Sequence, residues 1–556
     1  MNRQRLARIL GPLSVPSLMF GVLFFAASLT PSLIPRGPVL QGVLGGLVMA
    51  IGYLLAQIVG LLWRAADFPV LSRRPAKILT ALVSIPLVAF FLWVLGSSLV
   101  WQNDIRIRMG MEEAEALNLA TILLLAAATF AIAFAVGRLV VALFRLIRAR
   151  LLRVMPARRA NVLGFVLVVL ILVVITRDGI VDRVVRGLDE SFELAQALFD
   201  TAPPAPIDDR FTGSPASAVD WKAMGQPGRD FVTGGPDAAA ISAFTRRPAL
   251  DPIRVYVGRA NAETPEARAK LALAELIRLD AFDREILIVA SPTGTGWMDP
   301  GSHDPVEYMH GGDIATVAVQ YSYMQSPFAL VFETRTGLDQ ASATVSTIHD
   351  YWRRLPDETR PRLYIHGLSL GAWSSMYATT LFQLVNAPIA GAFWAGPPFP
   401  SDFWNRAQQT RVEGSLWVKP VIRDGSLIRY ATRGNDGSEG AADWGPMRIM
   451  FLQYPSDAIT FFEPLSTFRA PVWMREPPGD GVSPYLRFVP IVTQLQLALD
   501  MALATTVPGG YGHSYYAQDY IGPWVSVTAP EGWSEADTLR LKAHCDNGFQ
   551  NGCTNQ

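Results

Sequence analysis

The sequence predicts a multi-span helical membrane region followed by an α/β domain, whose mostly parallel sheet carries helices on both faces. The membrane region follows from hydropathy: the 556-residue chain has a mean hydropathy of +0.24, and its long apolar stretches lie in its first third. The α/β domain follows from periodicity, because short β-branched runs alternate with amphipathic helical stretches beyond residue 250.

Five apolar stretches in residues 1–176 are long enough, or nearly so, for a helix to cross about 30 Å of hydrocarbon. The first could be mistaken for a signal peptide after MNRQRLAR, but four more stretches follow it and no small-residue cleavage site is evident. We therefore expect about five transmembrane helices, near residues 13–33, 39–63, 78–101, 119–137 and 160–176.

The distribution of Lys and Arg predicts the orientation of this region. Basic residues are frequent in the N-terminal tail and around 64–77 and 145–159, whereas the loops on the opposite side carry only Arg36, Arg106 and Arg108. Because basic loops stay in the cytoplasm, the N-terminus is expected there. With an odd number of spans, everything after residue 176 is expected on the extracytoplasmic side.

Residues 177–250 are expected to connect the two parts. The stretch 177–199 has apolar residues at a helical period with charges between them, which predicts an amphipathic stalk that either lies on the bilayer or docks under the next domain. From Thr201 to about Leu250 the composition turns to Pro, Gly, Ala and Asp, which predicts a linker with little structure.

Residues 251–556 carry the alternating pattern. PIRVYVG, REILIVA and IATVAVQY predict strands, and TPEARAKLALAELIRL predicts a helix that begins with a Thr cap and a Pro. A further helix is expected from about Leu338 to Arg354. PRLYIH then predicts a strand and AWSSMYATTLFQLV a helix, with GLSLG between them.

The pentapeptide GLSLG has the G-x-S-x-G spacing of a nucleophile elbow and predicts that Ser369 is a catalytic nucleophile. The spacing alone is a weak signal in a glycine-rich chain. Its position between a strand and a helix is the context that an elbow requires, because a strained turn must hold the serine clear of the sheet.

An acid is expected after this serine in the chain. Asp457 follows the apolar run MRIMFLQY, in a loop at the carboxyl end of a predicted strand, where ligands gather in open α/β sheets. We predict that Asp457 is the acid of the triad. Asp519 is its main rival.

The base is expected after the acid, and His513 lies in the glycine-rich segment VPGGYGHSYYAQDY. We predict that His513 takes the serine proton, while the carboxylate fixes its tautomer. The other histidines either precede the serine, lie in the terminal tail or could approach from another loop: His349 and His366, His544, and His303 and His310.

The oxyanion of the tetrahedral intermediate needs donors. One is the backbone amide of Leu370, which follows the serine. The second is expected from the loop SPTGTGW after ILIVA, where we choose Thr295. The alternative, that PTGTG is an ordinary Pro-Gly turn, stays open.

The chain resembles the bacterial membrane-anchored α/β-hydrolase family with a multi-span N-terminal region. The matching stretches are GRDFV, PIRVYVG, ILIVASPTGTGW, EYMHGGDIATVAVQYSY, HGLSLGA, YPSDAITFF and GYGHSY. The resemblance implies an α/β-hydrolase fold with Ser369, Asp457 and His513 as the triad, in the bacterial inner membrane. One departure is Ala458, where we would expect Pro after the acid.

Other features bear on substrate and partners. The segment 399–443 is rich in aromatic residues, and we expect a cap over an acyl pocket, although it could be an insertion whose aromatics pack inward. Asp299, His303, Asp304, Glu307 and His310 cluster in sequence without a zinc motif, so no metal or other cofactor is expected. With a net charge of zero and no long basic run outside the membrane-flanking loops, no nucleic acid is expected as a partner.

Together these features predict a membrane-tethered serine hydrolase of the carboxylic-ester type, esterase-like or lipase-like, acting on acyl esters of lipidic character. An acyltransferase would share the triad and differ only in whether water or an alcohol resolves the acyl-enzyme. A non-catalytic membrane sensor or scaffold is the alternative from another class. Cys545 and Cys553, the only cysteines, are expected to form a disulfide on the oxidising side of the membrane.

Overall fold

A computed structural model describes residues 13–175, 203–324, 334–379, 385, 387–548 and 550–553. The predicted stalk at 177–199 lies outside the described residues. The chain forms two compact units that interleave in sequence. The first, here called the helical unit, comprises Met1–Gly187, Pro464–Ala470 and Val482–Asp500, and the second, the sheet unit, comprises Leu188–Glu463, Pro471–Gly481 and Met501–Gln556.

The N-terminal part of the helical unit is a set of apolar helices. They are α2 (Val15–Ser28), α3 (Pro38–Ala65), α4 (Arg73–Arg108), α5 (Leu119–Leu151) and α6 (Ala157–Val173). By length and composition, α3, α4 and α5 could cross a membrane. Helices α2 and α6 are apolar but have 14 and 17 residues, so the count of about five spans stays a prediction.

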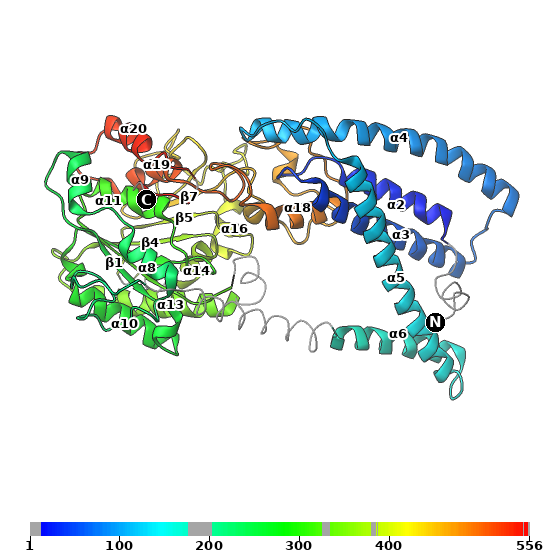
Figure 1. The fold of residues 1–556 in the computed structure, drawn as a ribbon, viewed down its shortest axis with the longest axis horizontal. Coiled ribbons are helices and arrows are strands. Elements are labelled where there is room, and N and C mark those ends of the chain that lie inside the picture. Colours follow the sequence, from blue (N-terminus) through cyan, green and yellow to red (C-terminus); the bar gives the residue numbers. More distant parts are fainter. Residues whose placement is uncertain are drawn as a thin grey trace. The chain divides into compact units, whose positions relative to one another are not determined.

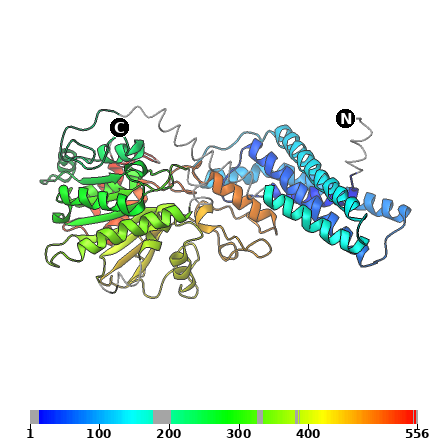
Figure 2. The ribbon, with the colours of Figure 1, turned by 90° about the horizontal axis from the view of Figure 1, so that it is seen from below.

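Small residues let α3 pack closely on its neighbours, and Figures 1 and 2 both show α2 and α3 side by side. A Cβ on Gly46 would lie 2.4 Å from the Ala126 carbonyl oxygen of α5, and one on Gly45 would lie 2.4 Å from the Phe25 ring of α2. Close approach at small residues is the usual packing mode of membrane helices, so these helices form a tight core.

The helical unit also contains residues from far along the chain. Helix α18 (Val492–Leu503) packs Val492 against Leu44 and Val48 of α3. The Asp500 carboxylate accepts hydrogen bonds from the Ser32 hydroxyl (2.9 Å) and the Leu33 amide (2.8 Å) in the loop between α2 and α3. The expected catalytic domain 251–556 therefore contributes two segments to the helical unit, which the sequence pattern did not indicate.

The sheet unit is built on seven parallel strands in the order β1-β3-β2-β4-β5-β7-β6. Most of these strands are buried along their whole length, as expected of a parallel sheet covered on both faces. The strands are β1 (Ile253–Val257), β2 (Ile286–Ser291), β3 (Ile314–Val319), β4 (Arg362–Leu368), β5 (Gly391–Ala395), β6 (Ile428–Ala431) and β7 (Arg448–Leu452).

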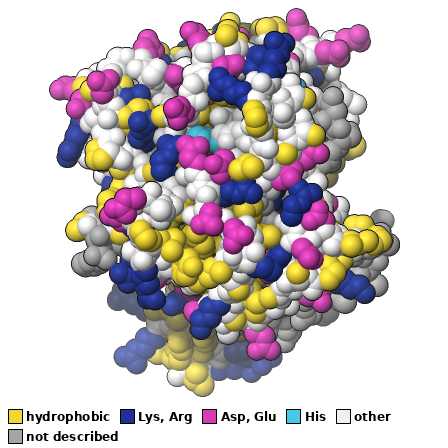
Figure 3. All heavy atoms as spheres, turned by 90° about the vertical axis from the view of Figure 1, so that its left-hand side faces the viewer, with side chains coloured by type: hydrophobic (Ala, Val, Ile, Leu, Met, Phe, Trp, Pro, Cys, Tyr) yellow, Lys and Arg dark blue, Asp and Glu magenta, His cyan; other side chains and the backbone are white. Residues whose placement is uncertain are grey.

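Helices cover both faces of this sheet, which confirms the predicted fold class (Figure 1). One face carries α10 (Pro265–Arg278), α13 (Thr334–Trp352) and α14 (Leu370–Ala378), and the other carries α11 (Pro300–Met309), α19 (Ala517–Thr528) and α20 (Glu535–His544). The predicted cap of α10 is confirmed, since the Thr264 hydroxyl accepts from the Ala267 amide. On the face seen in Figure 3, basic and acidic side chains are interspersed.

Two segments differ from the expected organisation. Residues 203–250, expected to be a linker, contain α8 (Gly225–Thr233) and α9 (Ala238–Thr245), and Phe231 and Met224 are buried beside β1. The expected cap 399–443 contains α16 (Asp402–Gln409) and the edge strand β6. Its Trp404 is buried and donates to Gln453, so part of this segment belongs to the core rather than to a cover.

The predicted disulfide between Cys545 and Cys553 is confirmed. It follows α20 directly, and the Cys553 amide donates to the Asp304 carboxylate on α11 (2.9 Å). The bridge therefore fastens the C-terminal tail to the body of the sheet unit.

Candidate active site

Ser369 lies in the sharp turn between β4 and α14, where the sequence predicts a nucleophile elbow. Its backbone has φ 57° and ψ −123°, a combination that is unfavourable for a residue with a Cβ. The Ser369 amide donates to the Ala395 carbonyl at the end of β5 (2.9 Å), which anchors the turn to the neighbouring strand. Strain of this kind persists where surrounding structure holds it, and it is frequent at active sites.

The two glycines of the motif are required by close approach. A Cβ on Gly367 would lie 2.3 Å from the Gly371 carbonyl carbon, and a Cβ on Gly371 would lie 2.0 Å from the Ser291 carbonyl oxygen. Both distances are too short for any side chain. The elbow is therefore packed against the carboxyl end of β2, beside the loop that follows Ser291.

Asp457 and His513 come together at the same edge of the sheet. Asp457 follows β7, and the His513 ring nitrogen Nδ1 lies 2.7 Å from the Asp457 carboxylate oxygen Oδ2. Both side chains are buried, with Asp457 fully enclosed. A carboxylate in this position fixes the imidazole tautomer, with Nδ1 protonated and Nε2 free to accept a proton.

Further donors hold the Asp457 carboxylate in place. Asp457 caps the short helix α17 (Ala458–Phe461) and accepts from the amides of Ile459 (2.9 Å) and Thr460 (3.3 Å). The Thr460 and Tyr515 hydroxyls donate to its other oxygen, each at 2.9 Å. Ala458 is the first residue of α17, a position that also suits proline, so the departure from the family pattern leaves the carboxylate in the same place.

Tyr515 is a site residue to which the sequence reasoning gave no role. Burial, with the Asp457 carboxylate beside it, raises the pKa of Tyr515 well above its ordinary value, so the phenol stays a hydrogen-bond donor. The Tyr515 ring also meets the His513 ring edge to face, at 5.4 Å between centroids. Its position two residues after the histidine, in GHSYY, was the available signal.

The rival residues make other contacts. Asp519 accepts from the Tyr454 hydroxyl (2.7 Å) and the Gly434 amide (2.9 Å). The remaining histidines are bonded elsewhere: His310 to Glu285 and Thr528, His366 to Ser302 and Phe393, His349 to Ala387, and His544 to Tyr308. His303 meets the rings of Phe231 and His366.

Ser369 and His513 lie against the same turn. The Ser369 amide donates to the Ala395 carbonyl. Gly396 follows Ala395, and a Cβ placed on it would lie 2.7 Å from carbon Cε1 of the His513 ring. The His513 Nε2 atom is buried and has no hydrogen-bond partner among the residues that the structure describes. A proton acceptor at the turn that also anchors the strained serine is compatible with activation of that serine.

Of the two predicted oxyanion donors, one directly follows the serine and the other lies in the loop whose first residues pack on the elbow. Leu370 begins α14, so its amide is one of the helix N-terminal amides without an intrahelical partner. Thr295 lies in the loop after β2, and its carbonyl accepts from the buried Gln320 side chain (3.0 Å). The Gly296 carbonyl accepts from the Tyr256 hydroxyl (2.8 Å), so this loop has a fixed shape. Thr295 as the second donor stays a prediction.

The acidic and histidine cluster at 299–310 has structural roles. Arg254 donates to Asp304 (2.6 Å) and Glu307 (2.8 Å) in a buried ion-pair group, and Asp299 caps α11 at Gly301. Within the described ranges, no group of three or more such side chains is arranged to hold a metal ion.

Comparison with known proteins places the chain in a family. Residues 253–541, 289 of the 556 residues, match a family described as "Alpha/beta-hydrolase family", and residues 29–236 match "Alpha/beta-hydrolase family N-terminus". No curated protein and no solved structure matches the chain. The resemblance expected from the motifs is thereby confirmed for both parts of the chain.

Proposed function

Since the chain belongs to an alpha/beta-hydrolase family with its own N-terminal region, we propose that it is a membrane-tethered serine hydrolase that cleaves carboxylic esters. Ser369 attacks the acyl carbon while His513 Nε2 takes the hydroxyl proton, and Asp457 stabilises the resulting imidazolium. The amides of Leu370 and Thr295 receive the oxyanion. His513 then returns its proton to the leaving alcohol, and water releases the acyl group from the serine.

The observation that carries this proposal is the contact between His513 Nδ1 and Asp457 Oδ2 (2.7 Å). His513 Nε2 has no partner in the described part of the chain, and the strained Ser369 is anchored at the same Ala395–Gly396 turn that His513 contacts. An idle scaffold would have no reason to keep a strained serine, a buried carboxylate and an aligned imidazole together. An acyltransferase would need the same groups, and only the acceptor of the acyl group would differ.

We propose that the substrate is a lipidic acyl ester. Apolar helices in the same chain would tether the hydrolase region to a bilayer, where lipid esters are concentrated. Phe403, from the segment after β5, packs on Trp394 yet stays 39% exposed, which leaves an aromatic surface for an acyl chain.

The expected result is that the full-length protein hydrolyses a long-chain phospholipid or diacylglycerol in vesicles faster than a short water-soluble ester at equal concentration. The vesicle rate should depend on Ser369, so the Ser369→Ala variant in the same vesicles is the control. Equal rates on both substrates, with no gain from the interface, would remove the lipidic assignment and leave the hydrolase assignment standing.

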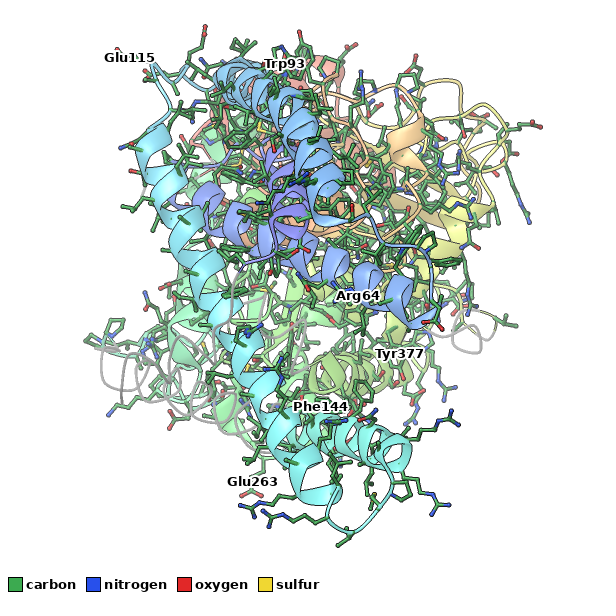
Figure 4. All side chains as sticks on the ribbon, turned by 90° about the vertical axis from the view of Figure 1, so that its right-hand side faces the viewer. Arg64, Trp93, Glu115, Phe144, Glu263 and Tyr377 are labelled. Carbon is green, nitrogen blue, oxygen red and sulfur yellow. A yellow bond between two sulfur atoms is a disulfide. The ribbon has the colours of Figure 1, made fainter. Side chains whose placement is uncertain are left out.

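For localisation, we propose the bacterial inner membrane, with the sheet unit on the extracytoplasmic side. Two features support this orientation. In Figure 4, Glu115 lies at one end of α5 and Phe144 towards the other, where the arginines of 145–159 follow. The segment 482–500 bonds to the Glu115 end of the helices, through Ser483 to Asp104 in the last turns of α4 and through Asp500 to Ser32 in the loop after α2.

Protease added to intact spheroplasts is therefore expected to digest the sheet unit, and Cys545 and Cys553 from native membranes should resist alkylation until they are reduced. Inverted membrane vesicles, in which the other face is exposed, serve as the control. A sheet unit that is protected in spheroplasts and carries freely alkylated thiols would reverse the orientation.

A further inference from the structure

A long apolar crevice runs between α2 and α4 of the helical unit. One part has a volume of about 530 Å³ and the other about 450 Å³, and they adjoin at Leu23 and Phe90, which line both. From Pro16 to Ala27 the crevice follows α2 for about 17 Å at 1.5 Å per residue, and Thr30 lies just after that helix. This length exceeds one leaflet of hydrocarbon, about 15 Å, so an acyl chain could lie along it.

The walls of the crevice are apolar and open. Leu23 is 40% exposed, Val83 is 47% exposed and Phe90 is 44% exposed, although each faces another helix across the gap. Over the C-terminal half of α2 the two helices pack directly, with Phe25 against Phe91 at 5.5 Å between ring centroids and Ala26 in one buried cluster with Val94. Nearer the start of α2 the Ser84 hydroxyl lies 3.8 Å from the Met19 sulfur. Apolar walls that stay exposed beside such a contact, in a membrane region, are suited to a hydrocarbon chain.

The two ends of the crevice differ. One end is apolar, whereas the other is lined by Thr30, Trp93, Trp101, Tyr485 and Arg487. Trp and Tyr are enriched at the level of lipid headgroups. This end lies beside the loop that meets Asp500, which is the end we assign to the extracytoplasmic side.

Arg487 supplies a positive charge at this end. Its Nη1 donates to the carbonyls of Pro484 (2.6 Å) and Leu486 (2.9 Å), which orients the guanidinium within its own loop. A guanidinium has five N–H donors, so further donors are available for an anion such as a phosphate. The side chain is exposed, as a headgroup contact requires.

We infer that this crevice binds one acyl chain of an anionic phospholipid, with the phosphate at Arg487. The apolar walls select the chain, the aromatic residues set the depth of the headgroup, and the arginine selects negative charge. The site does not depend on the proposed ester hydrolysis, because none of its lining residues belongs to the triad. Its ligand is a bilayer lipid rather than a free phosphate, since most of the lining is apolar.

The test uses full-length Ser369→Ala protein, so that the probe is not consumed, in phosphatidylcholine vesicles that contain phosphatidylglycerol with a photoreactive acyl chain. Crosslinks should map to α2 and α4 at the crevice. Val83→Trp, which fills the crevice, should lower this labelling about tenfold, whereas Leu62→Trp, on a 61% exposed position of α3, should not.

The charge is tested separately. Arg487→Gln should lower labelling by the phosphatidylglycerol probe about tenfold and lower labelling by the matched phosphatidylcholine probe less, because the choline cation already offsets the phosphate charge there. Arg469→Gln, an exposed arginine of the same unit, is the matched control. Crosslinks spread over all exposed helix faces, or labelling that neither Val83→Trp nor Arg487→Gln changes, would show exchanging bilayer lipid only and overturn the inference.

Discussion

Replacing Asp457 by asparagine is expected to lower kcat for ester hydrolysis by roughly 10⁴-fold. The asparagine amide would face the His513 ring nitrogen Nδ1, which now lies 2.7 Å from a carboxylate, and would favour the tautomer with Nε2 protonated. That tautomer cannot take the proton of Ser369. The measurement is the initial rate on a chromogenic acyl ester, with protein folding checked by thermal unfolding.

Asp519→Asn is the matched control for this experiment. Asp519 is also buried and hydrogen-bonded, but its partners are Tyr454 and Gly434 rather than His513. Its replacement should change stability more than kcat. If Asp519→Asn abolished activity while Asp457→Asn left it near normal, the acid would be misassigned.

Replacing Asp500 by alanine is expected to destabilise the helical unit by about 3 to 5 kcal/mol. The carboxylate is fully buried and accepts hydrogen bonds from Ser32 and Leu33. Its negative charge also interacts favourably with the buried Arg36. Burial raises the pKa of Asp500 to about 6, so keeping this charge inside the protein is unfavourable in itself. Its removal leaves the Ser32 and Leu33 donors without this acceptor and removes a negative charge that interacts with Arg36.

The measurement is thermal unfolding of the full-length protein in detergent, where a drop in Tm of roughly 10 °C is expected. Asp500→Asn, which keeps an acceptor oxygen but no charge, should fall between alanine and wild type. Glu112→Ala, at an exposed position of the same unit, should leave Tm unchanged. An unchanged Tm for Asp500→Ala would mean that α18 is not held by this carboxylate.

The same substitution is expected to lower activity. Helix α18 ends at Leu503, and the next residue, Ala504, accepts a hydrogen bond from the His513 amide (2.6 Å). Asp500 lies near the C-terminal end of α18, so loosening that end would reach the loop that carries the base. The membrane region would then have a role in catalysis beyond anchoring.

Local sequence patterns were sufficient for the parts of the fold that depend on local geometry. The Thr264 and Pro265 start of α10 follows from capping chemistry, and the elbow at Ser369 follows from the two glycines that such a turn needs. The order of serine, acid and histidine then limited the choice of partners. These predictions needed no knowledge of contacts between distant residues.

Features that depend on distant contacts were not predicted. The apolar side of α18 has the period of any amphipathic helix, so nothing in the sequence indicated that it packs on α3. Strand β6 is a run of four residues inside a polar, glycine-rich segment, a pattern that predicts a cap rather than a strand of the sheet. The Pro and Gly content of 203–250 suggested a linker, although its buried Trp221 and Phe231 were a sign of packing.

The most direct test of the account is covalent labelling with a fluorophosphonate probe, which reacts with an activated serine whatever the natural substrate is. The account predicts that the wild-type full-length protein is labelled, that Ser369→Ala is not, and that His513→Ala is labelled far more slowly. Equal labelling of wild type and Ser369→Ala, or none of the folded wild type, would contradict the assignment of Ser369 as the nucleophile.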